Sequence, residues 1–140
     1  MTGWDMRHPP PIDEELARWT LETAPELQAL RTALRTAVAN RAPAAADPRD
    51  LAERLTIVAT ELAGNALRHG RPPTVVILER SDGNLVIDVL DTAGKGPSVD
   101  VRRRAGDGGL GLVVAGHLAE QVGWFPTDEG KRVWATFPLR

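Results

Sequence analysis

The sequence contains no cysteine and no tyrosine, and only Lys95 and Lys131 are lysines. The absence of cysteine excludes disulfide bonds, zinc sites built from thiolates and catalysis by a thiol. No run of about 18 apolar residues occurs, so no transmembrane helix is predicted. The N-terminus also lacks the basic and then apolar order of a signal peptide, which favours a soluble, cytoplasmic protein.

Neither positively nor negatively charged residues are in large excess. The formal net charge of 140 residues is −2, so the chain has no basic footprint and direct binding to nucleic acid is not favoured. Hydrophobic residues make up 42% of the chain, which is enough for one packed core. Residues 1–15 carry three consecutive prolines and several acids, and we predict a mobile tail there, followed by a single domain over 16–140.

The hydrophobic periodicity predicts an α+β fold. Leucines and valines at helical spacing indicate helices over 24–40 and 48–69, each preceded by a capping signal, and a third apolar helix over 110–121. Runs rich in β-branched residues or alternating in polarity predict strands over 18–22, 74–80, 84–90, 123–126 and 132–139. This order predicts a two-layer α/β sandwich in which three helices cover one face of a mixed sheet.

The second predicted helix carries a polar pattern that packing does not require. The stretch TELAGNALRHG, residues 60–70, places Glu61 and Asn65 one turn apart, with His69 a further turn on. An Asn amide oxygen is a suitable ligand for Mg²⁺, and a carboxylate one turn earlier could orient or deprotonate a hydroxyl beside that metal. A solvated helix edge with ordinary polar residues explains the same segment, and for these residues alone both interpretations stay open.

Two glycine-rich stretches follow the predicted hairpin. Asp91 comes directly after a strand and could accept a hydrogen bond from an exocyclic amine, although Asp-Thr also begins ordinary turns. GDGGLGLVV, residues 106–114, puts four glycines at the start of an apolar helix, where exposed N–H groups and the helix dipole favour phosphate. The stretch is neither a Walker A loop nor a Rossmann turn.

Taken in order, these three segments resemble the boxes of the GHKL (histidine kinase-like) ATPase superfamily. ELAGNALRHG is similar to its N-box, DTAGKG to its first glycine box and GDGGLGL to its second. The closing GKRVWATFPL is similar to the last strand of the anti-sigma factor/serine kinase branch. The resemblance runs from about Trp19 to Leu139 and implies the fold of that superfamily, with residues 16–140 as the ATP-binding domain.

The resemblance also implies roles for individual residues, with ATP and Mg²⁺ as cofactors. Asn65 would coordinate the Mg²⁺ that bridges the ATP phosphates, Glu61 would be the general base, and Asp91 would bind the adenine amino group. Thr136 on the closing strand would lie near adenine. The remaining residues implied to bind nucleotide belong to the two glycine boxes: Gly94, Gly96, Gly106, Gly108, Gly109, Leu110 and Gly111.

Two functions remain open at this stage. The first is an anti-sigma-type serine/threonine protein kinase, which would bind a sigma factor and phosphorylate a small antagonist protein of the STAS type. Relatives often form homodimers, and the sequence leaves both a monomer and a homodimer open. The second is a non-catalytic module that sequesters a regulatory partner when nucleotide is bound. Two departures from the family pattern favour keeping the second: the first box has one extra residue, and Asp107 stands where many relatives have glycine.

Overall fold

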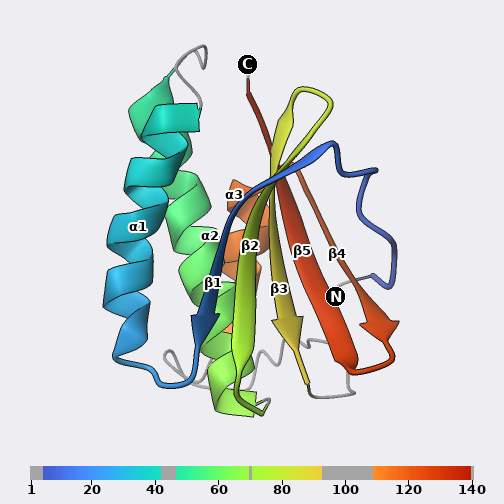
Figure 1. Ribbon diagram of the computed structural model, residues 1–140. Helices are drawn as coiled ribbons and strands as arrows, with labels where there is room; N and C mark the ends of the chain where they lie inside the picture. The colour runs from blue at the N-terminus through green and yellow to red at the C-terminus, as the bar shows by residue number, and fades with distance from the viewer. Residues whose placement is uncertain (1–4, 42–46, 70, 93–108, 140) are drawn as a thin grey trace.

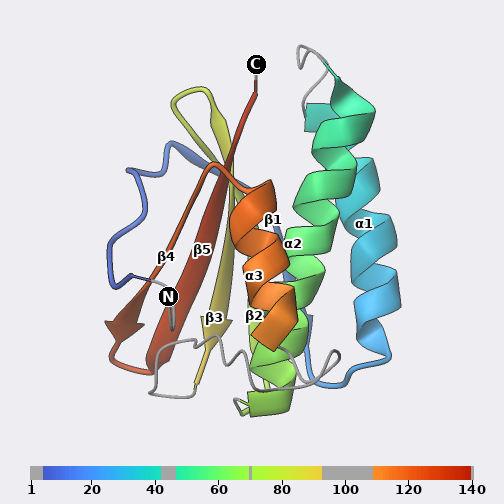
Figure 2. The same cartoon turned by 180° about the vertical axis from the view of Figure 1, so that it is seen from behind.

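The computed structural model describes residues 5–41, 47–69, 71–92 and 109–139, and these form one sheet with a layer of helices on one face (Figure 1). In chain order the described elements are β1 (Glu14–Leu21), α1 (Glu26–Arg41), α2 (Pro48–His69), β2 (Thr74–Ser81), β3 (Asn84–Asp91), α3 (Gly109–Leu118), β4 (Gln121–Thr127) and β5 (Gly130–Pro138). Seen from behind, the three helices lie side by side in front of the sheet (Figure 2). The predicted α+β architecture is confirmed.

The strand order β1-β2-β3-β5-β4 corrects one part of the prediction. We predicted a mixed sheet, but each pairing between the five described strands is antiparallel. The helix α3 does return the chain so that β4 runs parallel to β3. However, β5 folds back between the two and pairs with both, so the parallel strands are not neighbours. The parallel contact that remains is an isolated bridge between Met6 and Trp124.

Local signals place most element ends within a few residues of the prediction. The side chain of Glu26 accepts hydrogen bonds from the N–H groups of Glu22 and Thr23, and these bonds hold the pKa of Glu26 below its usual value. Asp47 accepts a bond of 3.0 Å from the N–H of Asp50 and so caps α2. The strand β1 begins four residues earlier than predicted, because its start pairs with the far end of β2.

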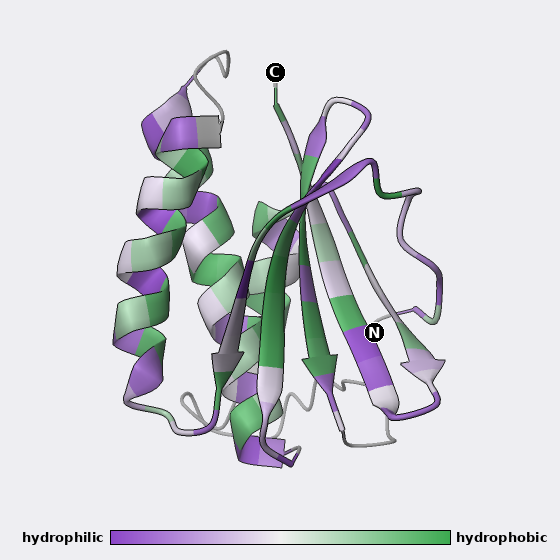
Figure 3. Ribbon diagram, in the orientation of Figure 1, coloured by the Kyte–Doolittle hydropathy of each residue, from purple (hydrophilic) through white to green (hydrophobic). Residues whose placement is uncertain are grey.

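The core lies between the helices and one face of the sheet. Alternate residues of β3 and β5 point into it, and the largest of them, Phe137, is fully buried. Figure 3 shows α1 and α2 alternating between hydrophilic and hydrophobic residues, whereas β2 and β3 are mostly hydrophobic along their length. On the second face of the sheet, Ile77 and Val86 are fully buried as well.

Residues 5–13 lie across that second face of the sheet (Figure 1), and we call them the strap. The Arg7 N–H donates to the Trp124 carbonyl, and the indole N–H of Trp134 donates to the Arg7 carbonyl over 2.8 Å. The Arg7 guanidinium lies 5.8 Å from the centre of the Trp134 ring, and His8 contacts Phe125. These contacts tie the part of the chain that we predicted as a tail to strands β4 and β5.

Among the described residues, no helix has both the length and the hydropathy needed to cross a membrane.

The strap makes a stability prediction at Gly123. A Cβ at this position would overlap Arg7 Cγ and lie 2.7 Å from Cζ2 of the buried Trp134. We therefore expect Gly123→Ala to lower the free energy of unfolding by about 1–3 kcal/mol, since overpacking forces neighbouring groups to move. Urea unfolding followed by circular dichroism measures this change.

Gly116 provides the matched control. It is exposed within α3, and a Cβ there meets nothing within 4 Å. Gly116→Ala should raise the free energy of unfolding by up to about 1 kcal/mol through helix propensity. An unchanged or increased stability in Gly123→Ala would show that the strap does not pack against β4 in solution.

Candidate functional site

Three of the predicted functional segments meet at one end of the domain. The C-terminal end of α2, the C-terminal end of β3 and the N-terminal end of α3 lie at the same edge of the sandwich (Figure 2). The turn between β4 and β5 lies at the same edge, because Lys131 of β5 pairs with Asp91 at the end of β3. Gly130 comes directly before Lys131 in that turn. Segments separated by up to 60 residues are thereby brought into one region.

Glu61 and Asn65 lie on α2, and both are partly buried at its edge. The helix forms here because its other side buries residues such as Leu55, Val58 and Leu62 under the sheet and the neighbouring helices. The pattern of one acid and one amide a turn apart is therefore displayed on a rigid element, as predicted. Asn65 is the nearer of the two to the C-terminal end of α2.

Glu61 also borders a groove between α1 and α2. The groove has a volume of about 190 Å³ and is lined by Glu61 together with Arg31, Arg35, Thr56, Ile57 and Thr60. Arg35 is paired with Glu53 over 3.0 Å in the same region. The predicted base therefore stands beside two guanidinium groups, on a part of the helix that a second protein can reach from the surface.

Asp91 is buried and has a charged partner that the sequence analysis did not identify. The Lys131 Nζ lies 3.0 Å from Asp91 Oδ2, and the two side chains are only 5% and 2% exposed. The chain just beyond Asp91 is held as well, since the Thr92 hydroxyl donates to the Arg71 carbonyl over 2.7 Å. A Cβ at Gly130 would collide with the Asp91 backbone, so a glycine is needed for the close approach of the turn.

The second glycine box leads directly into α3. Gly109, Leu110 and Gly111 are the first three residues of that helix, so their N–H groups lie at its positive end. A helix of 10 residues with this start can bind phosphate oxygens. The other glycines predicted to bind nucleotide lie outside the described residues: Gly94, Gly96, Gly106 and Gly108.

Thr136 does not join this group. In β5, the alternate residues Val133, Ala135 and Phe137 face the helices, so Thr136 lies on the opposite face. Its hydroxyl accepts a hydrogen bond of 3.2 Å from the N–H of Gln121 at the start of β4. The alternation of the strand thus separates Thr136 from Asp91, and Lys131 is the residue of β5 that reaches Asp91.

Among the described residues, no group of three or more histidine, aspartate or glutamate side chains could hold a metal ion by itself. The amide oxygen of Asn65, near the C-terminal end of α2, is a hard oxygen donor, and a Mg²⁺ held there would take its other ligands from phosphate and water.

The comparisons with known proteins agree with this arrangement. Residues 23–137 match the family model described as "Histidine kinase-like ATPase domain". Fourteen chains of solved structures match the fold. One is described as "The crystal structure of the RsbU and RsbW domains of Rv1364c from Mycobacterium tuberculosis", with a TM-score of 0.62 and 19% identity. The match covers 87% of this chain and 32% of that one, so this chain spans about a third of its relative. No curated protein sequence matches.

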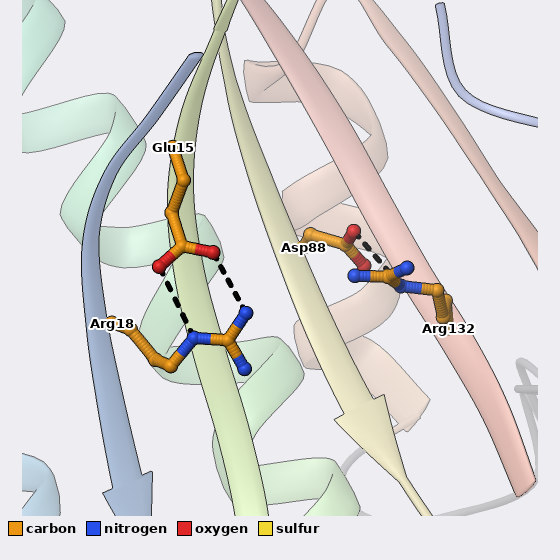
Figure 4. Close-up of polar contacts among 4 residues, drawn as sticks. All are labelled: Glu15, Arg18, Asp88 and Arg132. Atoms are coloured by element: carbon orange, nitrogen blue, oxygen red, sulfur yellow. Dashed lines mark hydrogen bonds and ion pairs between the residues drawn. The ribbon is translucent and has the colours of Figure 1, made fainter. Parts of the chain in front are cut away.

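A second group of polar side chains lies on the face of the sheet opposite the helices (Figure 4). Glu15 and Arg18 form an ion pair on β1, with Nη2 and Oε1 2.7 Å apart. Arg132 Nε lies 3.1 Å from Asp88 Oδ2 in an ion pair, although this N–H makes no hydrogen bond. Charged residues at single positions of otherwise apolar strands are the sequence signal for this group, and the sequence analysis did not use it.

Glu79 belongs to the same face and is only 6% exposed. Within the described part of the chain, Glu79 Oε1 and Asp88 Oδ1 are buried without a hydrogen-bond partner. Burial, and then the negative charge of Asp88, raise the pKa of Glu79 to about 7. Burial also raises the pKa of Asp88, against the opposing effect of Arg132. The pair therefore carries less than its full negative charge as the pH falls below about 7.

This pair predicts a pH dependence of stability. The pKa of Glu79 is raised from 4.5 to about 7 on folding, so between these values the folded protein binds more protons than the unfolded chain. Stability should therefore fall as the pH rises from about 4.5 to 7 and then level off. Glu79→Gln should remove most of this decline and raise the free energy of unfolding at pH 8 by roughly 2 kcal/mol.

Urea unfolding at pH 5.5, 6.5 and 8 measures this dependence. Glu14→Gln is the control, because Glu14 also lies in the sheet but its side chain is 47% exposed in a pair with Arg80. The control should reproduce the profile of the wild type. If Glu79→Gln also declined with pH like the wild type, the titrating group would have to be a different one.

Proposed function

The chain belongs to the histidine kinase-like ATPase domain family, and on that premise we propose that it is an ATP-binding regulator of the anti-sigma type that phosphorylates an antagonist protein on serine or threonine. The observation that carries the proposal is that the C-terminal end of α2, the end of β3 and the glycine start of α3 lie at one end of the domain. Asn65 lies near that end of α2, and Asp91 is the last residue of β3. An amide oxygen, a buried carboxylate and free helix N–H groups are the three kinds of group that a magnesium-bound nucleotide requires.

The residues present fit that ligand. Asn65 would hold the Mg²⁺, the first N–H groups of α3 would bind phosphate oxygens, and Asp91 would accept a hydrogen bond from the adenine amine. A carboxylate accepts up to four hydrogen bonds, so the ion pair with Lys131 through one oxygen is compatible with a second donor. When bound, Mg-ATP supplies the phosphoryl group and the positive charge that offsets the phosphates.

Glu61 would then serve the protein substrate. It lies one turn before Asn65, at the edge of the groove between α1 and α2. A serine or threonine hydroxyl placed there could pass its proton to the Glu61 carboxylate as the hydroxyl oxygen attacks.

The identity of the protein partners is also a proposal. The resemblance to the anti-sigma branch favours a sigma factor and a small antagonist protein of the STAS type as partners, in the cytoplasm. The relative described as containing RsbU and RsbW domains shares the fold at 19% identity, which supports the architecture and leaves the partner to be tested.

One observation favours the second candidate function, a nucleotide-dependent binding module. Asp91 is already paired with a buried lysine, and the box that it begins has one residue more than the family pattern. A site that binds nucleotide in this altered way could order a docking surface without transferring phosphate. Transfer of label separates the two candidates.

The ATP site is tested by titration calorimetry with and without Mg²⁺. We expect the wild type to bind ATP with a Kd of roughly 1–10 μM, about −7 to −8 kcal/mol, and Asn65→Ala to lose the part that depends on Mg²⁺. Asn40→Ala, an exposed amide on α1, should bind like the wild type. A wild type that bound no ATP at millimolar concentration would contradict the proposal.

The kinase reaction is tested by transfer of labelled phosphate to a STAS-type antagonist protein. Glu61→Gln should lower the rate of transfer by about 10²–10⁴-fold, because the general base is lost. Its affinity for ATP should stay close to that of the wild type. Glu53→Gln is the control, because Glu53 lies earlier on the same helix as Glu61 and its side chain is paired with Arg35. Stable complex formation without transfer in the wild type would identify the binding module instead.

A further inference from the structure

Lys131 is the charged residue of the nucleotide-site region whose role the proposed function leaves open. It pairs with Asp91 in register across β3 and β5, and its Nζ lies 3.0 Å from Asp91 Oδ2. Both residues have the strand parity of the core positions Val89 and Val133, so both lie on the face of the sheet toward the helices. Each side chain is at most 5% exposed.

Such a pair is costly to build and costly to break. Taking two charges out of water loses their hydration, and the pair offsets this loss only when the two groups hold a close geometry. The ion pair with Lys131 therefore fixes one carboxylate oxygen of Asp91 in place.

The backbone around Asp91 is fixed from two sides. The turn that carries Lys131 approaches so closely that Gly130 leaves no room for a Cβ against the Asp91 backbone. On the other side, Thr92 is bonded to the Arg71 carbonyl between α2 and β2. With its backbone held and one oxygen taken by Lys131, the Asp91 carboxylate has little freedom to rotate.

We propose that Lys131 is a positioning residue for base recognition, which holds the Asp91 carboxylate turned so that it accepts a hydrogen bond from the exocyclic amine of a purine. The inference rests on the proposed binding of ATP. Lys131, a buried cation on β5, would act through Asp91 and determine which base the site prefers.

The test compares ATP with purine riboside triphosphate, which has hydrogen in place of the exocyclic amino group. Calorimetry gives the Kd of each triphosphate with Mg²⁺ for the wild type, Lys131→Met and Lys131→Arg. The wild type should prefer ATP by about 10-fold, the worth of one hydrogen bond to a charged group. Lys131→Arg should keep this preference, because it keeps the cation. Lys131→Met should lower the preference to within about 2-fold while its affinity for the analogue stays unchanged.

The ratio of the two affinities separates positioning from general damage. If Lys131→Met bound both triphosphates more weakly by the same factor, Lys131 would have a structural role and the inference would be wrong. Tighter binding of ATP by Lys131→Met would also overturn it, since the lysine would then compete with the base. A wild type that binds ATP and the analogue equally well would contradict this inference but not the proposed function. A wild type that binds neither triphosphate would remove the proposed function, and the inference with it.

Discussion

The burial of α2 is the constraint on which the rest of the structure depends. This helix contacts α1 on one side and α3 on the other, and it also packs on β2, β3 and β5. Half of its 22 residues are buried, so its rotation about its own axis is fixed by packing. Because the rotation is fixed, the edge that carries Glu61 and Asn65 is held in one direction. A rotation of the helix about its axis would change the direction in which these polar groups point.

The same constraint explains why the sequence predicts this part of the molecule well. The leucines of α2 recur at helical spacing, Asp47 provides a cap, and the polar residues stand out against an apolar background. These are local signals, and they depend only on residues within a few turns. The hairpin of β2 and β3 was predicted for the same reason, since Asp82 and Gly83 both adopt the positive φ that a two-residue turn requires.

Features that depend on distant segments were not predictable in this way. Nothing in the sequence of β5 indicates that it lies between β3 and β4, and the sheet was therefore expected to be mixed. The face on which Thr136 lies follows from the parity of a strand whose register is set by β3. Likewise, Lys131 reads as an ordinary charge after a turn until the pairing brings it to Asp91. The elements that carry the candidate site could be predicted, but the buried counterion of Asp91 could not.

The sheet separates two electrostatic environments. On the helix side, Asp91 is balanced by the cation of Lys131. On the other side, Glu79 and Asp88 have the partial compensation of Arg132, and burial raises the pKa of both carboxyl groups. Buried carboxyl groups on the two faces of the sheet are therefore stabilised to different degrees by nearby cations.

The strap has a consequence for the edges of the sheet. An edge strand exposes backbone groups that can pair with another chain, and proteins usually cover or interrupt such edges. At β4, the N–H and the carbonyl of Trp124 are bonded to Asp5 and Arg7 of the same molecule. Pairing between two sheets, whether in ordered assembly or in aggregation, is thereby directed away from β4 and toward the opposite edge at β1.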